Sequence, residues 1–199
     1  MGKREDLSIL LVVSITSFMG TFLVSAVNIA LPTIENALSL NAIELSWVIT
    51  AFILAMAMFM LPAGSWGDRT DNRRLFKVGV VLFTLASAIC YVAPNGYWLI
   101  GARFLQGIGT AFSGTTGQAI LVASFPAEKR GQVLGISVAS VYGGLALGPL
   151  IGGIITLHMG WRSLFLIAFF LGLVTISISL LFLKSKKERH EKTAAKGSD

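Results

Sequence analysis

Six long stretches of the sequence contain no charged residue, and this feature constrains the fold more than any other. They run over residues 7–34, 45–67, 78–102, 104–127, 131–161 and 163–183. Each is longer than the roughly 18 apolar residues that indicate a membrane-spanning helix. Lipid offers no partner to backbone N–H and C=O groups, so each stretch must be a helix or belong to a closed barrel. Because the apolar runs are continuous rather than alternating, we predict helices.

The composition excludes an ordinary soluble domain. Only 13% of the 199 residues are charged, against about a quarter in a typical globular domain. We therefore predict an all-α membrane protein with six transmembrane helices in one bundle over residues 7–183. The expected spans are about 7–31, 45–66, 75–93, 97–124, 132–157 and 163–183, with an N-terminal segment at 1–6 and a basic tail at 184–199. The third span ends early because Pro94, Asn95 and Gly96 form a turn signal.

The positions of the basic residues predict the orientation. With six spans, four groups of cations fall on one side: Lys3 and Arg4; Arg69, Arg73, Arg74 and Lys77; Lys129 and Arg130; and six in the tail. The positive-inside rule then makes both termini cytoplasmic. The net charge of +6 is thus a signal of topology and of contact with anionic lipid, not of a nucleic-acid partner. We expect an integral protein of the cell (plasma or inner) membrane.

The polar residues of the first span share one helical face. Ser14, Ser17, Thr21, Ser25 and Asn28 are three or four residues apart. A single membrane serine or threonine commonly bonds back to its own helix. Five in register favour the lining of a polar cavity.

The fourth span contains one charged residue within an apolar run, Arg103. A stripe of small and polar residues surrounds it: Gln106, Gly107, Thr110, Gly114, Gly117 and Gln118. A cation inside the bilayer usually faces a transport pathway or a partner. The alternative is that Arg103 snorkels to the outer interface, since it lies only about six residues from Tyr97.

The fifth span has a groove of small residues. Ser140, Gly144, Gly148 and Gly152 step by four along one face, which lets another helix approach closely. Pro149 removes one helical hydrogen bond and should bend the helix. No set of residues predicts catalysis, a metal site or a cofactor: Cys90 is the single cysteine, and the two histidines are isolated. We do not expect an enzyme.

The short polar turn between the second and third spans carries a family signature. Gly64, Asp68, Arg69, Arg73 and Arg74 resemble the loop motif of the major facilitator superfamily. Three further segments also resemble it: the fourth-span motif at Arg103, Gln106, Gly107 and Gly109, the antiporter motif at Gly144, Gly148, Pro149, Gly152 and Gly153, and residues 27–32, which are similar to the fourteen-span drug:proton antiporters.

The resemblance implies both a fold and a mechanism. The fold is a six-helix bundle of two three-helix inverted repeats, one half of a carrier whose substrate site lies between two bundles. The loop motif implies a cytoplasmic latch formed by Asp68, Arg69 and Arg73. Arg103 is implied in proton coupling, and the glycine groove is implied to pack on the opposite bundle. We expect Thr21, Ser25, Asn28, Arg103 and Gln118 to line the pathway for a small-molecule substrate.

Two positions depart from the family pattern. Asp71 and Asn72 stand where the loop motif usually has Gly-Arg; both tolerate a left-handed turn, so we expect the turn to be kept. Leu23 stands where the drug antiporters have an acid, so no span contains a carboxylate.

One bundle alone would leave the first-span polar stripe, the stripe around Arg103 and the glycine groove facing lipid. We therefore expect a partner, either a second six-span or larger half or a second copy. The chain is either a piece of a longer transporter or a natural half. The expected function is export of small amphipathic, drug-like compounds, with proton coupling an open question. The alternative is a six-span scaffold or assembly subunit that transports nothing.

Overall fold

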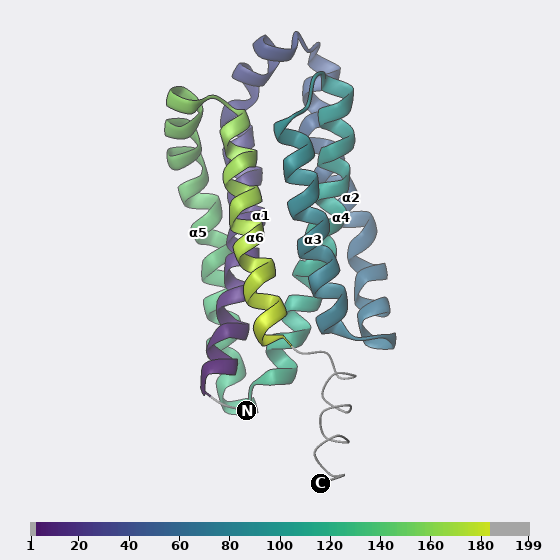
Figure 1. The fold of residues 1–199 in the computed structure, drawn as a ribbon, viewed down its shortest axis with the longest axis vertical. Helices are drawn as coiled ribbons and strands as arrows, with labels where there is room; N and C mark the ends of the chain where they lie inside the picture. The colour runs from purple at the N-terminus through teal and green to yellow at the C-terminus, as the bar shows by residue number, and fades with distance from the viewer. Residues whose placement is uncertain (1–2, 184–199) are drawn as a thin grey trace.

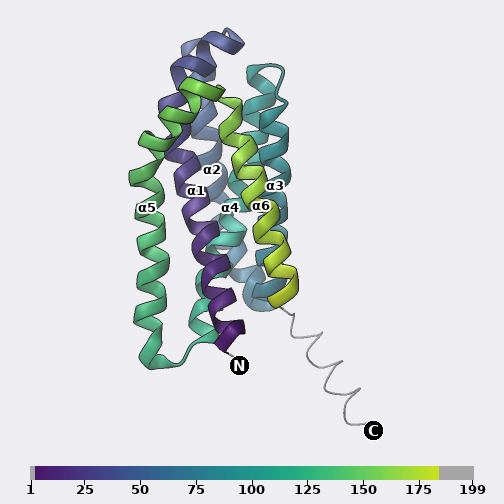
Figure 2. The same cartoon turned by 60° about the vertical axis from the view of Figure 1, so that its left-hand side comes forward.

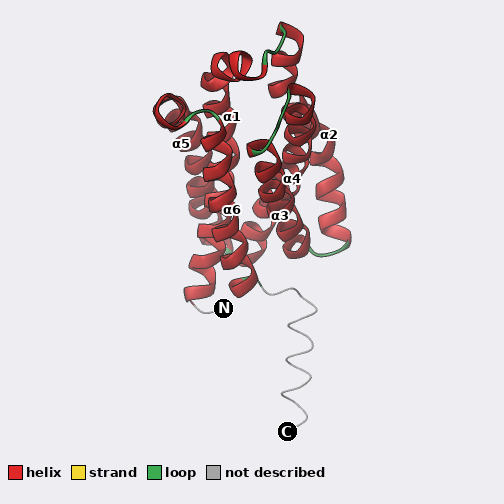
Figure 3. Cartoon of the chain, turned by 45° about the horizontal axis from the view of Figure 1, so that its top comes forward, coloured by secondary structure: helices red, strands yellow, loops and turns green. Residues whose placement is uncertain are grey.

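The computed structural model describes residues 3–183, and nearly all of them lie in six helices. The helices are α1 (Lys3–Leu38), α2 (Ala42–Arg69), α3 (Asn72–Tyr91), α4 (Gly96–Ser124), α5 (Ala127–Met159) and α6 (Arg162–Phe182). They run along one long axis, and the described part of the chain contains no strand (Figures 1 and 3). The all-α prediction is confirmed.

Polar side chains cap the starts of α2, α3 and α4: Asn41, Asp71 and Asn95. Asn41 caps α2 and accepts hydrogen bonds from the N–H groups of Ile43 and Glu44, while the Glu44 side chain accepts from the Asn41 N–H. Asn95 caps α4 by accepting from the Trp98 N–H. These caps satisfy backbone donors that the first turn of a helix leaves free. They define the short turns between long apolar helices.

The helices pair in a repeated pattern. α1 packs along α5, α4 packs along both α2 and α3, and α3 also packs on α6. If α1, α2 and α3 correspond to α4, α5 and α6, then the α1–α5 contact of one repeat corresponds to the α4–α2 contact of the other. This correspondence is expected for two three-helix repeats. Figures 1 and 2 show α5, α1 and α6 side by side, with α2, α3 and α4 forming the other part of the bundle. α1 begins and α6 finishes at the same end of the bundle.

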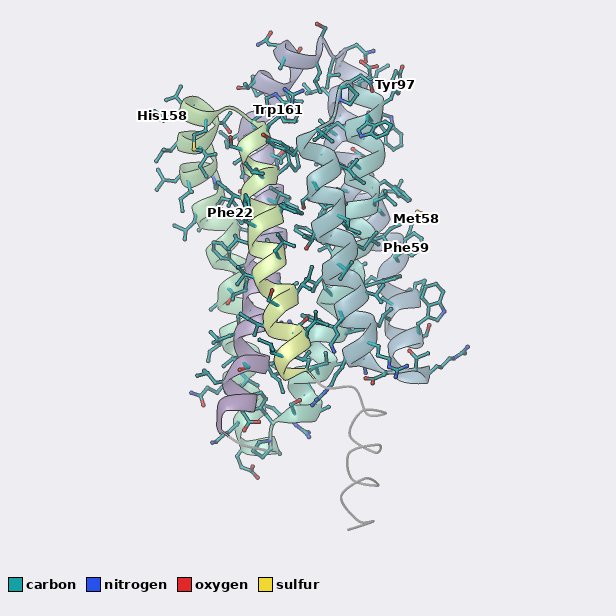
Figure 4. The ribbon with its side chains drawn as sticks, in the orientation of Figure 1. Phe22, Met58, Phe59, Tyr97, His158 and Trp161 are labelled. Carbon is teal, nitrogen blue, oxygen red and sulfur yellow. The ribbon has the colours of Figure 1, made fainter. Side chains whose placement is uncertain are left out.

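The apolar core has two main parts along the axis. One cluster lies toward the end where α6 begins and includes Leu23, Val48, Leu99, Trp161 and Phe165. The other lies toward the end where α1 begins and includes Ile9, Phe76, Leu121 and Val133. Tyr97, His158 and Trp161 lie at the end of the bundle where α6 begins, and Met58 points away from the bundle (Figure 4). Exposed apolar side chains of this kind suit contact with hydrocarbon.

Five of the six helices are long and apolar enough to cross a membrane, judged by length and composition. The exception is α4, which has 29 residues but carries the polar and small stripe around Arg103. The first helix also differs from expectation: it continues through Pro32 to Leu38 rather than ending near Leu31. A proline removes its own N–H bond and crowds the carbonyl four residues before it, but it does not have to end a helix. The turn after Pro32 is supported by Asn36, whose Nδ2 donates to the Pro32 carbonyl at 2.9 Å. α3 and α5 likewise begin before the expected residues 75 and 132.

Candidate functional site

Arg103 is completely buried where α4 meets α2 and α3. Its exposed fraction is 0%. Nε donates to the Val48 carbonyl of α2 at 3.2 Å, and the guanidinium carbon lies 4.3 Å from the centre of the Phe52 ring. A cation over an aromatic face is stabilised by the negative face of the ring. In this conformation the side chain does not snorkel to the outer surface.

A chain of hydrogen bonds through neutral side chains leads away from Arg103. Its Nη1 donates to Gln106 Oε1, Gln106 Nε2 donates to Ser87 Oγ at 2.7 Å, and Ser87 donates to the Phe83 carbonyl at 2.8 Å. All three side chains have 0% exposure. Arg103 Nη2 has no hydrogen-bond partner among the described residues. The positive charge is therefore surrounded by neutral acceptors and an aromatic ring.

Close backbone packing fixes this cluster. Gly107 lies against the Phe52 carbonyl of α2, and a Cβ atom at residue 107 would overlap it. Gly109 lies against α3, where a Cβ atom would come 2.5 Å from the Phe83 nitrogen. The two glycines of the fourth-span motif thus bring α4 close to both neighbours. Sequence reasoning missed Ser87 and Phe52. The signal available for Ser87 was that Thr84 and Ser87 are two polar residues, three apart, within the apolar third span.

The first-span stripe lies mainly against α5. Thr21 Oγ1 donates to the Val141 carbonyl at 3.0 Å, and Ser25 Oγ donates to the Leu145 carbonyl at 3.0 Å. Ser17 Oγ lies 3.4 Å from Ser137 Oγ. All three contacts join residues 120 apart in the sequence, so α1 and α5 run parallel and in register. We call this contact surface the α1–α5 seam.

The glycine groove of α5 forms the other side of the seam. Cβ atoms would come 2.6 Å from the Phe18 carbonyl oxygen at Gly144, 2.6 Å from Ser25 Cβ at Gly148 and 2.5 Å from Ala26 Cβ at Gly152. The groove is thus filled by α1 of the same bundle, and the expectation that it faces lipid or the opposite bundle is wrong for this structure. Gly153 is half-buried near Ile29, and Pro149 is exposed. The α1 side chains at this contact, such as Thr21 and Ser25, are small, so the backbones of α1 and α5 can approach closely.

The five expected pathway residues do not form one site. Gln118 is half-buried and donates to Ser137 Oγ at 2.9 Å. It lies 15 residues from Arg103, about 22 Å along a helix. Asn28 is exposed, and its Nδ2 donates to the Val24 carbonyl of its own helix at 3.3 Å. Thr21 and Ser25 are engaged by α5. Leu23, where the drug antiporters have an acid, is fully buried in the apolar core.

The loop motif lies at the same end of the bundle as the start of α1 (Figure 1). Gly64 is half-buried, with Thr115 Cγ2 3.5 Å from the position of a Cβ atom. Asp68 and Arg69 are exposed in the last turn of α2, Arg74 is exposed in α3, and Arg73 is half-buried. The motif therefore places several charges at one surface.

Asp71 and Asn72 do not form the left-handed turn that we expected. Asp71 is extended, with φ −159°, and it caps α3 by accepting from the Arg73 N–H at 2.9 Å. Asn72 is the first residue of α3, and its side chain lies against Gly67. Asp71 needs no glycine-like conformation because an extended residue with a carboxylate is a preferred helix cap.

Comparison with known proteins gives the family. The sequence model described as Major Facilitator Superfamily matches residues 13–198. The chain belongs to the major facilitator superfamily. Among solved structures, a bacterial homologue of the human lysosomal transporter Spinster, in an inward-facing and occupied conformation, superposes with a TM-score of 0.80 at 20% identity, over 93% of this chain and 46% of the other. This similarity confirms the fold.

Three curated relatives show the range of the superfamily members that this chain resembles. Riboflavin transporter RibZ of Clostridioides difficile is 37% identical over 90% of this chain and 40% of its own length. Methylenomycin A resistance protein of Bacillus subtilis is 34% identical over 83% of this chain and 36% of its own length. Multidrug resistance protein Stp of Mycobacterium tuberculosis is 33% identical over 92% and 34%. The chain spans less than half the length of each.

Family and composition together make this superfamily member an integral membrane protein. Within residues 3–183, no group of three His, Cys, Asp or Glu side chains is arranged to hold a metal ion.

Proposed function

We propose that this chain forms one six-helix bundle of a carrier that moves small amphipathic molecules across the cell membrane by alternating access. Arg103 is the observation that carries the proposal. It has no exposed surface, its described hydrogen-bond acceptors are neutral, and the charge-free stretches hold no carboxylate. Burying a cation in a membrane costs at least a few kcal/mol. A scaffold has no use for a buried charge, whereas a carrier can use it to bind a substrate or a coupling ion within the membrane.

We propose that a second six-span or larger half, or a second copy, completes the carrier. The chain covers 40% of the riboflavin transporter and 36% of the methylenomycin A resistance protein. Most of the polar faces of the bundle are covered by its own helices. Two observations support a second half: the chain covers less than half the length of these relatives, and the amide of Asn28 is exposed. Asn28 and the surface around it would face the substrate between the two halves.

We propose export as the direction of transport. Two relatives are named for resistance, to methylenomycin A and to multiple drugs, which supports the removal of amphipathic compounds. Because Leu23 is apolar and the carboxylates of the chain lie outside the six charge-free stretches, we propose that the acid of a proton-coupled cycle comes from the second half. Arg103 would then stabilise that acid or an anionic group of the substrate.

We also propose that the end carrying Asp68, Arg69 and Arg73 is cytoplasmic and acts as a latch between the halves. The basic residues at this end support the orientation by the positive-inside rule. The exposure of Asp68 and Arg69 leaves them available to a facing bundle. Both termini would lie on the same cytoplasmic side.

Dye flux in membrane vesicles tests the proposal. The chain is expressed with the C-terminal bundle of the Bacillus subtilis relative supplied as a second polypeptide, and efflux of a fluorescent amphipathic dye is recorded. Wild type and Arg130→Ala, an exposed arginine at the start of α5, should transport, whereas Arg103→Ala should fall to background. If every variant remains at background although both halves are present and associated, the scaffold function replaces transport.

A further inference from the structure

Pro149 leaves one carbonyl of α5 without its helical donor. In an α-helix the carbonyl of residue i accepts from the N–H of residue i+4, so the partner of the Leu145 carbonyl would be residue 149. Proline has no N–H, and its ring crowds the same carbonyl. An unpaired carbonyl within a membrane is costly, because lipid offers it no hydrogen-bond donor.

Ser25 of α1 supplies the missing donor. Its Oγ lies 3.0 Å from the Leu145 carbonyl oxygen and donates to it. Gly148 makes this approach possible, because a Cβ atom there would come 2.6 Å from Ser25 Cβ and 3.0 Å from Ser25 Oγ. The serine, the glycine and the proline therefore form one unit across two helices.

Thr21 shows what is particular about Ser25. Thr21 donates to the Val141 carbonyl at 3.0 Å, but it also lies 3.0 Å from the Ser17 carbonyl oxygen and 3.2 Å from that of Phe18. The helical donor to Val141 is the N–H of Leu145, which is present. Loss of the Thr21 hydroxyl thus leaves Val141 with a donor, whereas loss of the Ser25 hydroxyl leaves Leu145 without either one.

We infer that Ser25 is a positioning residue: its hydroxyl replaces the main-chain hydrogen bond that Pro149 removes and thereby holds the part of α5 beyond Pro149 against α1. This role goes beyond the proposed transport and does not depend on it. It also means that the Ser25 hydroxyl is engaged by α5 in this conformation, not free to bind substrate. Pro149 leaves the Leu145 carbonyl without a donor, and the Ser25 hydroxyl supplies one, so the two residues are matched.

A double-mutant cycle tests the match in the full chain, purified in lipid nanodiscs. In Pro149→Ala, the new N–H can donate to the Leu145 carbonyl, so the Ser25 hydroxyl is no longer needed. Ser25→Ala should shift the unfolding equilibrium toward the unfolded state by about threefold to tenfold when proline is present. In the Pro149→Ala background the same change should have less than half that effect on the logarithm of the equilibrium constant.

Thr21→Val is the matched control, because it should change the unfolding equilibrium constant by the same factor whether residue 149 is proline or alanine. Equal effects of Ser25→Ala in the two backgrounds, or none in either, would overturn the inference. If the Ser25→Ala variant does not accumulate as folded protein, its yield of folded protein is compared with that of the Ser25→Ala, Pro149→Ala double variant. Recovery of folded protein by Pro149→Ala supports the match, and continued failure refutes it.

Cross-linking reads the position of α5 directly. Ile29 Cγ2 lies 3.6 Å from the site of a Cβ atom at Gly153, so residues 29 and 153 face each other across the α1–α5 seam, and the rate of disulfide formation between cysteines at these positions reports on their separation. Cys90 is fully buried and stays in place. Ser25→Ala should slow disulfide formation severalfold, and Pro149→Ala should restore the rate. An unchanged rate in Ser25→Ala would show that other contacts hold α5.

Discussion

Gly79 of α3 and Gly109 of α4 each lie against the other's backbone: a Cβ atom on either residue would come 2.8 Å from the carbonyl oxygen of its partner. The contact is reciprocal, so neither helix can accept a side chain here without moving. It sits beside Ser113, whose backbone nitrogen would be 2.5 Å from a Cβ atom at Gly79. The approach of α3 to α4 brings Ser87 within reach of Gln106.

Substitution of either glycine by alanine should therefore separate the two helices. We expect Gly79→Ala and Gly109→Ala to lower the free energy of unfolding by about 1–3 kcal/mol, the usual range for overpacking. Thermal unfolding in nanodiscs measures the change. Gly114→Ala is the control on the same helix, since nothing lies within 4 Å of a Cβ atom there. Equal loss in the control would contradict the contact.

Ser87→Ala should destabilise the bundle by leaving the Gln106 amide buried without its acceptor. The expected loss is about 1–3 kcal/mol in the free energy of unfolding. Ser113→Ala is a matched control: Ser113 is also buried, but its hydroxyl bonds only to carbonyls of its own helix. Denaturant titration followed by circular dichroism compares the two variants. The cluster has no stabilising role if both titrations coincide with wild type.

Asp71→Gly distinguishes a helix cap from a glycine-like turn. Because Asp71 is extended and caps α3, glycine should cost a few tenths of a kcal/mol and alanine about 1 kcal/mol, while asparagine, which keeps the cap acceptor, should cost less than alanine. Unfolding midpoints of the three variants give the order. A gain in stability from Asp71→Gly would mean that the turn adopts the left-handed form in solution.

Asn28→Ala should affect flux and leave stability unchanged. Asn28 is exposed and bonds only to its own helix in this bundle. If its amide contacts substrate between two halves, its loss should lower dye efflux about threefold to tenfold, the value of one neutral hydrogen bond. Asn36→Ala is the control, because Asn36 is also exposed and donates to a carbonyl of α1. Equal flux in both variants would remove Asn28 from the pathway.

Much of the fold follows from the sequence. Membrane helices must form all their backbone hydrogen bonds internally, and they appear in the sequence as long runs without charged residues. The six helices, the polar α2–α3 turn and the need for close packing at Gly144, Gly148 and Gly152 were all predictable. The partner of that groove was not. Spacing shows that a helix packs there, but not that the polar stripe of α1 fits it.

The candidate site was harder to predict for a similar reason. Arg103 and Gln106 stand out in the sequence because they are polar within an apolar run. Their contacts with Val48 and Ser87 depend on how α2 and α3 lie against α4, which no local pattern records. Thr21 and Ser25 were grouped with Asn28 because they share a helical face, yet α5 covers the first two and leaves the third exposed.

The constant separation of 120 residues along the α1–α5 seam also has a consequence for synthesis. Translation adds about 5–20 residues per second, so α1 waits about 6–24 s before the matching part of α5 is made. During that time its hydroxyls can bond within their own helix, as Thr21 does with the Ser17 carbonyl. The α1–α5 seam can therefore form only after the intervening helices α2, α3 and α4 have been synthesised, which makes it a late contact although one of its two helices is made early.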